Sequence, residues 1–118
     1  MQKQLILCLS ALFTTNLFAE CKTTSVYEDI ACFEKELKTN KTQLNQAYQK
    51  LYKSMDQAGQ QVLEKSQKNW LAYKNSHCDE LVAHLSTGSL GAGNRLINLS
   101  CNADLIEQRI KQLKYLDE

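Results

Sequence analysis

The sequence predicts an all-α fold, a disulfide-stapled antiparallel bundle of about three helices. Three observations lead to this prediction. Apolar residues recur at helical spacing in three long segments. The chain has no proline, and its four glycines lie at Gly59 and within 88–93, so only two breaks separate the segments. Four cysteines follow the N-terminal leader, and this even number suits two disulfides.

The leader, residues 1–19, has the pattern of a secretory signal peptide. Lys3 supplies a positive charge, residues 5–13 form an apolar run, and Ala19 ends the leader with a small side chain. We therefore expect cleavage after Ala19, which leaves residues 20–118 as one domain. The expected location is periplasmic or secreted, where disulfides form and persist.

The composition argues against several other kinds of protein. No stretch reaches the about twenty apolar residues of a membrane span, so we expect no membrane anchor. Loss of Lys3 with the leader leaves equal numbers of basic and acidic side chains, which indicates no nucleic-acid partner. Lipidation of Cys21 is a less favoured alternative, because Glu20 stands where a lipidation site has a small residue.

The first helix is predicted to begin after Ser25 and to end near Gly59. Ser25 and Glu28 fit a capping box at its start. Apolar residues then follow at intervals of seven, at Ile30, Leu37, Leu44 and Leu51. At 1.5 Å per residue this helix is roughly 45 Å long, and its apolar stripe needs partner helices to cover it.

The second helix is predicted over residues 60–85 and the third after a loop over residues 86–93. The stripe of the second comprises Leu63, Trp70, Tyr73, His77 and Leu81. The third has its strongest apolar pattern between Leu105 and Leu113. Its first half contains Asn98, Ser100 and Asn102, residues that weaken helices, so we expect this half to be weak or broken.

An up-down-up arrangement brings all four cysteines to one end of the bundle. We favour Cys78–Cys101, which closes a loop of about two dozen residues and contributes roughly 3 kcal/mol in the chain-entropy model. Cys21 then pairs with Cys32. The pairing of Cys32 with Cys78 and of Cys21 with Cys101 remains the alternative.

The sequence offers no catalytic, cofactor or metal site, and we expect no enzyme. His77 and His84 match no zinc-binding spacing, and the chain lacks a CxxC pair and a GxSxG elbow. Trp70, Tyr73 and Tyr48 fall at helical spacing and are expected in the core. The long loop is either a recognition edge or a plain turn.

Several short motifs in chain order resemble a known family. They comprise Leu44-Asn45-x-x-Tyr48, Gln67-x-x-Trp70-x-x-Tyr73 leading to Cys78, Gly88-Ser89, Cys101, Leu105 and Arg109-x-x-x-Leu113. This series resembles the LprI-type lysozyme inhibitor domain, also called domain of unknown function 1311. The motif residues Leu44, Asn45, Tyr48, Gln67, Trp70, Tyr73 and Arg109 are expected mainly in the core. The sequence departs from the family pattern at Lys41, Lys74 and Ile106, and an ion pair between positions 41 and 74 is not expected, because both are positive here.

The resemblance implies a binding protein of the cell envelope that inhibits lysozyme. An inhibitor needs a protruding group that enters the lysozyme cleft and occupies its two catalytic carboxylates. The candidates at the long loop are His84, Thr87, Ser89 and Arg95. The alternative is a structural or stress-related envelope protein that binds another protein or itself without inhibiting lysozyme.

Overall fold

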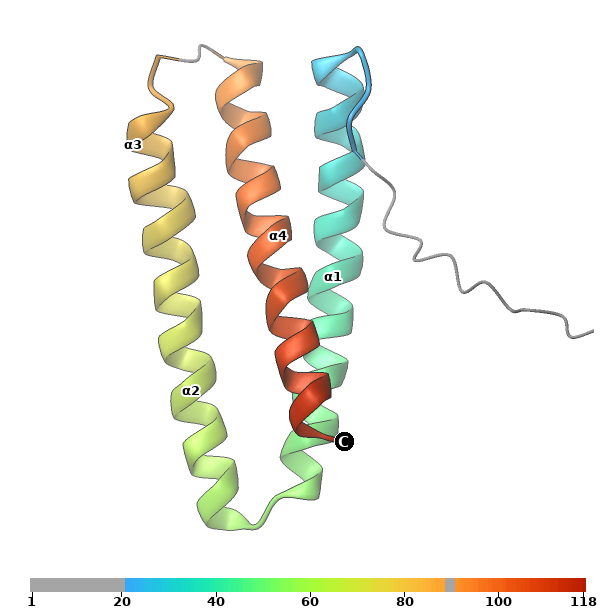
Figure 1. The fold of residues 1–118 in the computed structure, drawn as a ribbon, viewed down its shortest axis with the longest axis vertical. Helices are drawn as coiled ribbons and strands as arrows, with labels where there is room; N and C mark the ends of the chain where they lie inside the picture. Colours follow the sequence, from blue (N-terminus) through green and yellow to red (C-terminus); the bar gives the residue numbers. More distant parts are fainter. Residues whose placement is uncertain (1–20, 89–90) are drawn as a thin grey trace, which may run out of the picture.

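The computed structural model describes residues 21–88 and 91–118. Every element within these residues is helical, and the helices stand side by side in one bundle, as the sequence predicts (Figure 1). The expected leader, residues 1–19, lies outside the described residues, and so does Ser89 of the candidate loop.

Three long helical segments make up the bundle. Helix α1 spans Val26–Ser54, and helix α2 spans Gln57–Asn75. The second segment continues from α2 into a π-helix, η1 (Ser76–Val82), and ends in the short helix α3 (Ala83–Leu85). Helix α4 spans Ala92–Leu116.

The turn between α1 and α2 lies earlier in the chain than Gly59, near which the sequence predicts it. Helix α1 begins as expected, with the Glu28 N–H donating to Ser25 Oγ at 3.4 Å. It ends at Ser54, and Asp56 then caps α2 by accepting a hydrogen bond from the Gly59 N–H at 2.8 Å. Gly59 therefore lies in the first turn of α2, where the Asp56 carboxylate satisfies its N–H as an N-cap.

The core lies mainly between α1 and α4. Leu37 of α1 packs with Ala103, Ile106 and Ile110 of α4. Nearer the turn, a second cluster joins three helices and consists of Ala47, Leu51, Leu63 and Leu113. The predicted α1 stripe faces these clusters, with Leu37 and Leu51 buried and Ile30 and Leu44 half-buried.

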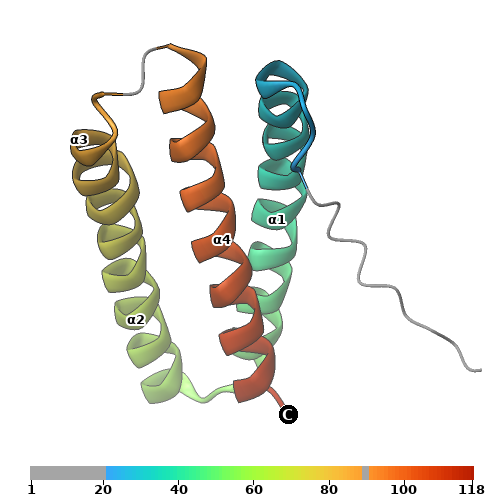
Figure 2. The same ribbon diagram turned by 45° about the horizontal axis from the view of Figure 1, so that its top comes forward.

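Helix α4 lies between α1 and the α2 segment in both views (Figures 1 and 2). One face of the α2 segment meets α4 at successive turns, through a mixed set of contacts. From the α1–α2 turn upward, these contacts are Leu63 with Leu113, Gln67 with Arg109, Trp70 with the α4 core residues, Lys74 with Asn102, and Cys78 with Cys101. Polar contacts and a disulfide thus hold the α2 segment as much as apolar packing does.

The favoured disulfide pairing is confirmed. Cys21 pairs with Cys32 across a Cα–Cα distance of 5.5 Å, and Cys78 pairs with Cys101 across 5.7 Å. The start of α1, the end of the α2 segment and the start of α4 meet at this end of the bundle (Figure 2). The first disulfide fastens the segment before α1, and the second joins η1 to α4.

The first half of α4 is helical throughout, so the break that the sequence allows there is absent. Two of the polar residues that suggested a break, Asn98 and Asn102, bind groups on the α2 segment. Asn98 Nδ2 donates to Asp79 Oδ1 at 2.8 Å, and Asn102 Oδ1 accepts from Lys74 Nζ at 2.7 Å. Tertiary contacts therefore override the low helix propensity of asparagine here.

Candidate functional site

The loop end of the bundle holds the candidate residues taken from the sequence. Ser86 Oγ donates to Asn94 Oδ1 at 2.7 Å, which ties the end of α3 to the start of α4 across the loop. Thr87 Oγ1 donates to the His84 carbonyl at 3.0 Å. Gly91 adopts φ = 59°, a left-handed value that favours glycine and directs the chain into α4. The loop is thus anchored at both of its ends.

The candidate residues differ in their availability to a partner. His84 and Thr87 are exposed and share one turn at the end of the α2 segment. Arg95 forms an ion pair with Glu34 of α1, and both side chains are largely exposed. His84 and Thr87 therefore form the part of the predicted set that faces solvent together, while Arg95 links α4 to α1.

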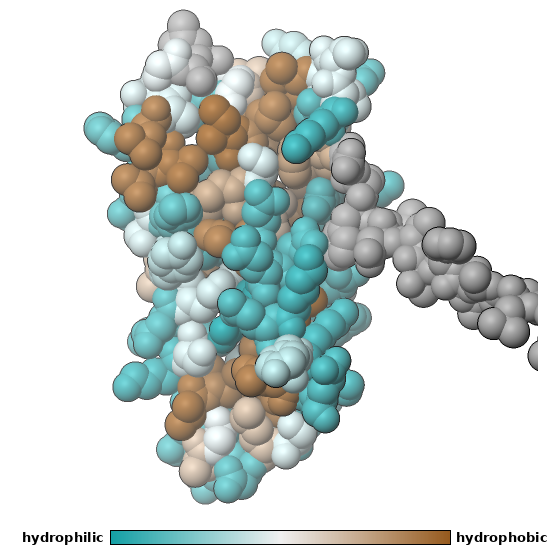
Figure 3. Space-filling view, viewed as in Figure 1, coloured by the Kyte–Doolittle hydropathy of each residue, from teal (hydrophilic) through white to brown (hydrophobic). Residues whose placement is uncertain are grey.

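An exposed apolar pair adjoins His84. Leu85 is 75% exposed and Leu81 is 50% exposed, and Figure 3 shows a hydrophobic area over η1 and α3. The expectation that Leu81 continues the core stripe is wrong. A π-helix has a wider turn than an α-helix, so residues after Ser76 are rotated relative to the α-helical register, and Leu81 turns outward.

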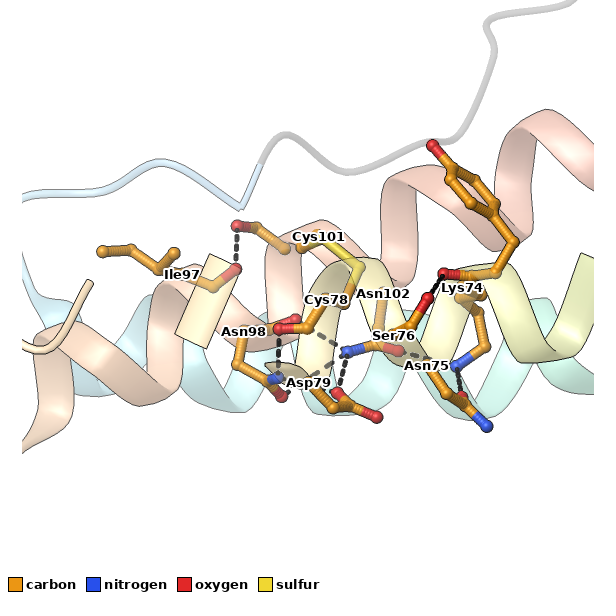
Figure 4. Close-up of a disulfide and its surroundings, with 11 residues drawn as sticks. Lys74, Asn75, Ser76, Cys78, Asp79, Ile97, Asn98, Cys101 and Asn102 are labelled. Carbon is orange, nitrogen blue, oxygen red and sulfur yellow. Dashed lines mark hydrogen bonds between the residues drawn. A yellow bond between two sulfur atoms is a disulfide. The ribbon is translucent and has the colours of Figure 1, made fainter. Parts of the chain in front are cut away.

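A polar network lies beside the Cys78–Cys101 disulfide (Figure 4). Lys74 Nζ donates to Asn75 Oδ1 at 2.9 Å and to Asn102 Oδ1 at 2.7 Å. Asp79 Oδ1 accepts from Asn98 Nδ2 at 2.8 Å and from Asn102 Nδ2 at 3.1 Å. Asn102 therefore bridges the ammonium of Lys74 and the carboxylate of Asp79.

The network shifts the pKa values of both ionisable groups. Burial lowers the pKa of Lys74, whose residue is only 8% exposed, and nearby Lys41 lowers it further while Asp79 opposes the change. Hydrogen bonds from Asn98 and Asn102 hold the pKa of Asp79 below its ordinary value. In the sequence both asparagines stand out only as weak helix formers. Their spacing of four, which places them on one helix face, is the signal that could have indicated the network.

A second buried cation lies nearer the α1–α2 turn. Arg109 is 8% exposed, and its guanidinium donates to Gln67 Oε1 and Ser66 Oγ, each at 3.0 Å. It also lies 5.8 Å from the centre of the Trp70 ring, within range of a cation–π contact. Through these contacts Arg109 holds α4 against α2.

The family motif residues divide between interior and surface. Arg109 is buried, and Leu44, Tyr48, Gln67 and Trp70 are half-buried. Asn45 and Tyr73 are exposed, Tyr73 by 53%, so their expected core placement is wrong. Tyr73 instead stacks on His77 along the outer face of the helix, with ring centres 5.5 Å apart.

The described residues contain neither a candidate metal site nor a candidate membrane span. Within residues 21–88 and 91–118, no three His, Cys, Asp or Glu side chains form a group that could hold a metal ion. Among the helices described, none is long and apolar enough to cross a membrane. The disulfide-bonded end presents exposed apolar, hydroxyl and imidazole groups.

The fold and this end of the molecule define a small all-α domain stapled by two disulfides. A family model described as Lysozyme inhibitor LprI matches residues 20–113, which is most of the chain. The chain therefore belongs to the LprI family of lysozyme inhibitors, as its motifs indicate. Comparison with curated proteins and with solved structures gives no match.

Proposed function

We propose that the protein is exported and binds a lysozyme, which it inhibits. The membership of residues 20–113 in an inhibitor family is the observation that carries this proposal. Two disulfides and the secretory pattern of residues 1–19 support a location outside the cytoplasm. Lysozyme acts on the cell wall, so inhibitor and enzyme would meet in that compartment.

The disulfide-bonded end is the surface that we assign to lysozyme. We call it the loop-end surface and define it by Leu81, His84, Leu85 and Thr87. Two exposed leucines beside polar groups match the usual arrangement of an interface, in which an apolar centre has a polar rim. The Cys78–Cys101 disulfide and the bond between Ser86 and Asn94 hold this surface in place, so little order remains to be gained on binding.

His84 is the group best placed to meet the catalytic carboxylates. Lysozyme uses one protonated and one ionised carboxyl group, and a protonated imidazole can pair with the ionised one. Arg95 could serve only after leaving Glu34. That separation costs little, since exposed ion pairs contribute at most about 1 kcal/mol.

Titration into a cell-wall lysis assay tests the function itself. Oxidised protein comprising residues 20–118 is added to animal-type, goose-type and bacterial muramidases in separate reactions. We expect stoichiometric inhibition of at least one enzyme. Protein whose two disulfides have been reduced, so that its helices pack less tightly, serves as the control. Full activity of all three enzymes at a large excess of the protein would contradict the proposal.

A groove at the other end of the bundle favours a second function, self-association in the envelope. It has a volume of about 420 Å³, and its lining is mainly apolar: Leu51, Met55, Ala58, Gly59, Val62, Leu63, Ser66 and Leu116. Figure 3 shows a hydrophobic area in this region, near the α1–α2 turn. A mass that rises with concentration in light scattering, together with no inhibition, would favour this structural role over lysozyme binding.

A further inference from the structure

A polar pocket opens where α1, η1 and α4 meet, apart from the loop-end surface. Its volume is about 280 Å³. Its polar lining consists of Lys41, Lys74, Asp79, Asn98 and Asn102, and its apolar lining of Leu37, Leu99 and Ile106. Convergent polar groups beside a smaller apolar floor can hold a small bound group in one orientation.

The charges of this pocket are not balanced. Lys41 and Lys74 are both positive, and Asp79 is the one carboxylate in the lining. Asp79 already accepts hydrogen bonds from Asn98 and Asn102. In residues 21–88 and 91–118, no ion pair joins either lysine to a carboxylate. The pocket thus retains one excess positive charge. Burial lowers the pKa of Lys74, and the nearby Lys41 ammonium lowers it further against the effect of Asp79.

The two lysines differ in a way that suits a binding site. Lys74 is buried and fixed, since two asparagine oxygens accept from its Nζ and the third hydrogen has no acceptor among the hydrogen bonds of the described chain. Lys41 is exposed on α1, and its side chain has no hydrogen bond or ion pair in that same part of the chain. A fixed inner cation and an exposed outer one can bind an anion from two sides.

We propose that this pocket binds a carboxylate group carried on a short aliphatic stem. The carboxylate would accept hydrogen bonds from the Lys74 and Lys41 ammonium groups, while the stem would lie on Leu37 and Leu99. One negative charge balances the pocket, and the apolar floor favours a stem over a fully hydrated anion. A free short-chain acid and the side chain of a glutamate share this chemistry.

Nuclear magnetic resonance of labelled, oxidised protein tests the proposal without reference to lysozyme. Propionate is titrated while the side-chain amide signals of Asn98 and Asn102 are followed. Propionamide, which has the same shape and no charge, and sodium chloride at matched ionic strength are the controls. We expect saturable shifts with propionate alone, and equal responses to all three additives would overturn the proposal.

Two variants locate the effect. Lys41→Gln should weaken propionate binding by roughly tenfold, because a hydrogen bond to a charged group contributes at least about 1.5 kcal/mol. Lys38→Gln removes the same charge from an exposed α1 position that does not line the pocket, and should leave the affinity unchanged. Equal weakening in both variants would mean that general charge attraction, and no pocket, holds the anion.

A second titration separates the two sources of the carboxylate. N-acetylglutamate amide presents a glutamate side chain with both backbone ends blocked. Tighter binding of this compound than of propionate would assign the pocket to a glutamate of a partner protein, and tighter binding of propionate would assign it to a free acid. Failure of both to bind would reject the pocket while leaving the inhibition assay unaffected, since that assay depends on the loop-end surface.

Discussion

Lys74 Nζ donates a hydrogen bond of 2.7 Å to Asn102 Oδ1, and both residues are 8% exposed. Asn102 also donates to Asp79, so one amide joins a buried ammonium to a carboxylate. This contact fastens the end of α2 to α4 one turn before the Cys78–Cys101 disulfide. Lys74 thus has an amide as its partner. Nearby Lys41 carries a second positive charge and cannot pair with it.

Loss of the Asn102 amide should destabilise the fold. Asn102→Ala leaves the buried Lys74 ammonium with one acceptor fewer, and we expect the free energy of unfolding to fall by about 2–3 kcal/mol. Urea denaturation measures it. Adding Lys74→Met should recover part of this loss, because the unsatisfied charge is then gone. Two losses that simply add would show that the residues are not coupled.

Removal of the Trp70 side chain should also cost stability. The ring packs against the cluster of Leu37, Ala103, Ile106 and Ile110 and lies beside the Arg109 guanidinium. Because Trp70 is only half-buried, we expect Trp70→Ala to cost about 3 kcal/mol, the low end for large aromatic residues. Leu71→Ala, at a neighbouring position 47% exposed, is the control and should cost under about 1 kcal/mol. Similar urea-denaturation midpoints for the two variants would contradict this placement of Trp70.

The two disulfides should contribute unequally. Cys78 and Cys101 are 23 residues apart and join two helices, so serine at both positions should lower the free energy of unfolding by roughly 3 kcal/mol. Cys21 and Cys32 are 11 apart and fasten only the segment before α1. Their replacement by serine should cost less. Thermal unfolding of the two double variants compares their stabilities. A larger loss of stability in the variant that lacks the Cys21–Cys32 disulfide would contradict this prediction.

Stability should pass through a maximum at mildly acidic pH. Burial and nearby Glu107 and Asp104 raise the pKa of Glu36, and burial raises the pKa of Asp104. A carboxyl whose pKa is raised on folding binds protons more readily when folded, so stability rises as the pH falls from neutral through that raised value. Asp79 has the opposite shift, so stability is lost at lower pH, as Asp79 is protonated below the ordinary carboxyl range.

Denaturation midpoints across this pH range, with two variants, check the prediction. Glu36→Gln should flatten the rise on mild acidification, because its charge is already absent. Asp79→Asn should remove part of the fall at lower pH. A wild-type midpoint that declines steadily from neutral to acidic pH would show that Glu36 and Asp104 do not have raised pKa values.

Periodicity predicted the helical segments and the faces of α1 that meet the core. It also led to the disulfide pairing, because the order of three antiparallel helices places the cysteines at one end. Leu37 and Leu51 illustrate why this works, since an apolar repeat on one helix can be buried only toward its neighbours.

The candidate site was predicted less completely, because it depends on how one helix is aligned against another. The π-helix turns Leu81 to solvent and directs Asp79 toward Asn98, and no periodic pattern marks that change of register. Nothing in the sequence marks Lys74 as buried, because its partner Asn102 lies on α4, 28 residues away. Arg95 lies in the first turn of α4, and its pairing with Glu34 depends on the distance between α1 and α4.

Inhibition by two matched variants tests most directly the claim that the loop-end surface binds lysozyme. Leu85 is 75% exposed beside His84, and Val62 is 69% exposed at the opposite end of the same helical segment. Against a lysozyme that the wild-type protein inhibits, Leu85→Asp should weaken inhibition by at least roughly tenfold, as expected for a central apolar contact, while Val62→Asp should inhibit like wild type. Unchanged inhibition by Leu85→Asp with a loss in Val62→Asp would contradict this assignment and direct attention to the groove at the α1–α2 turn.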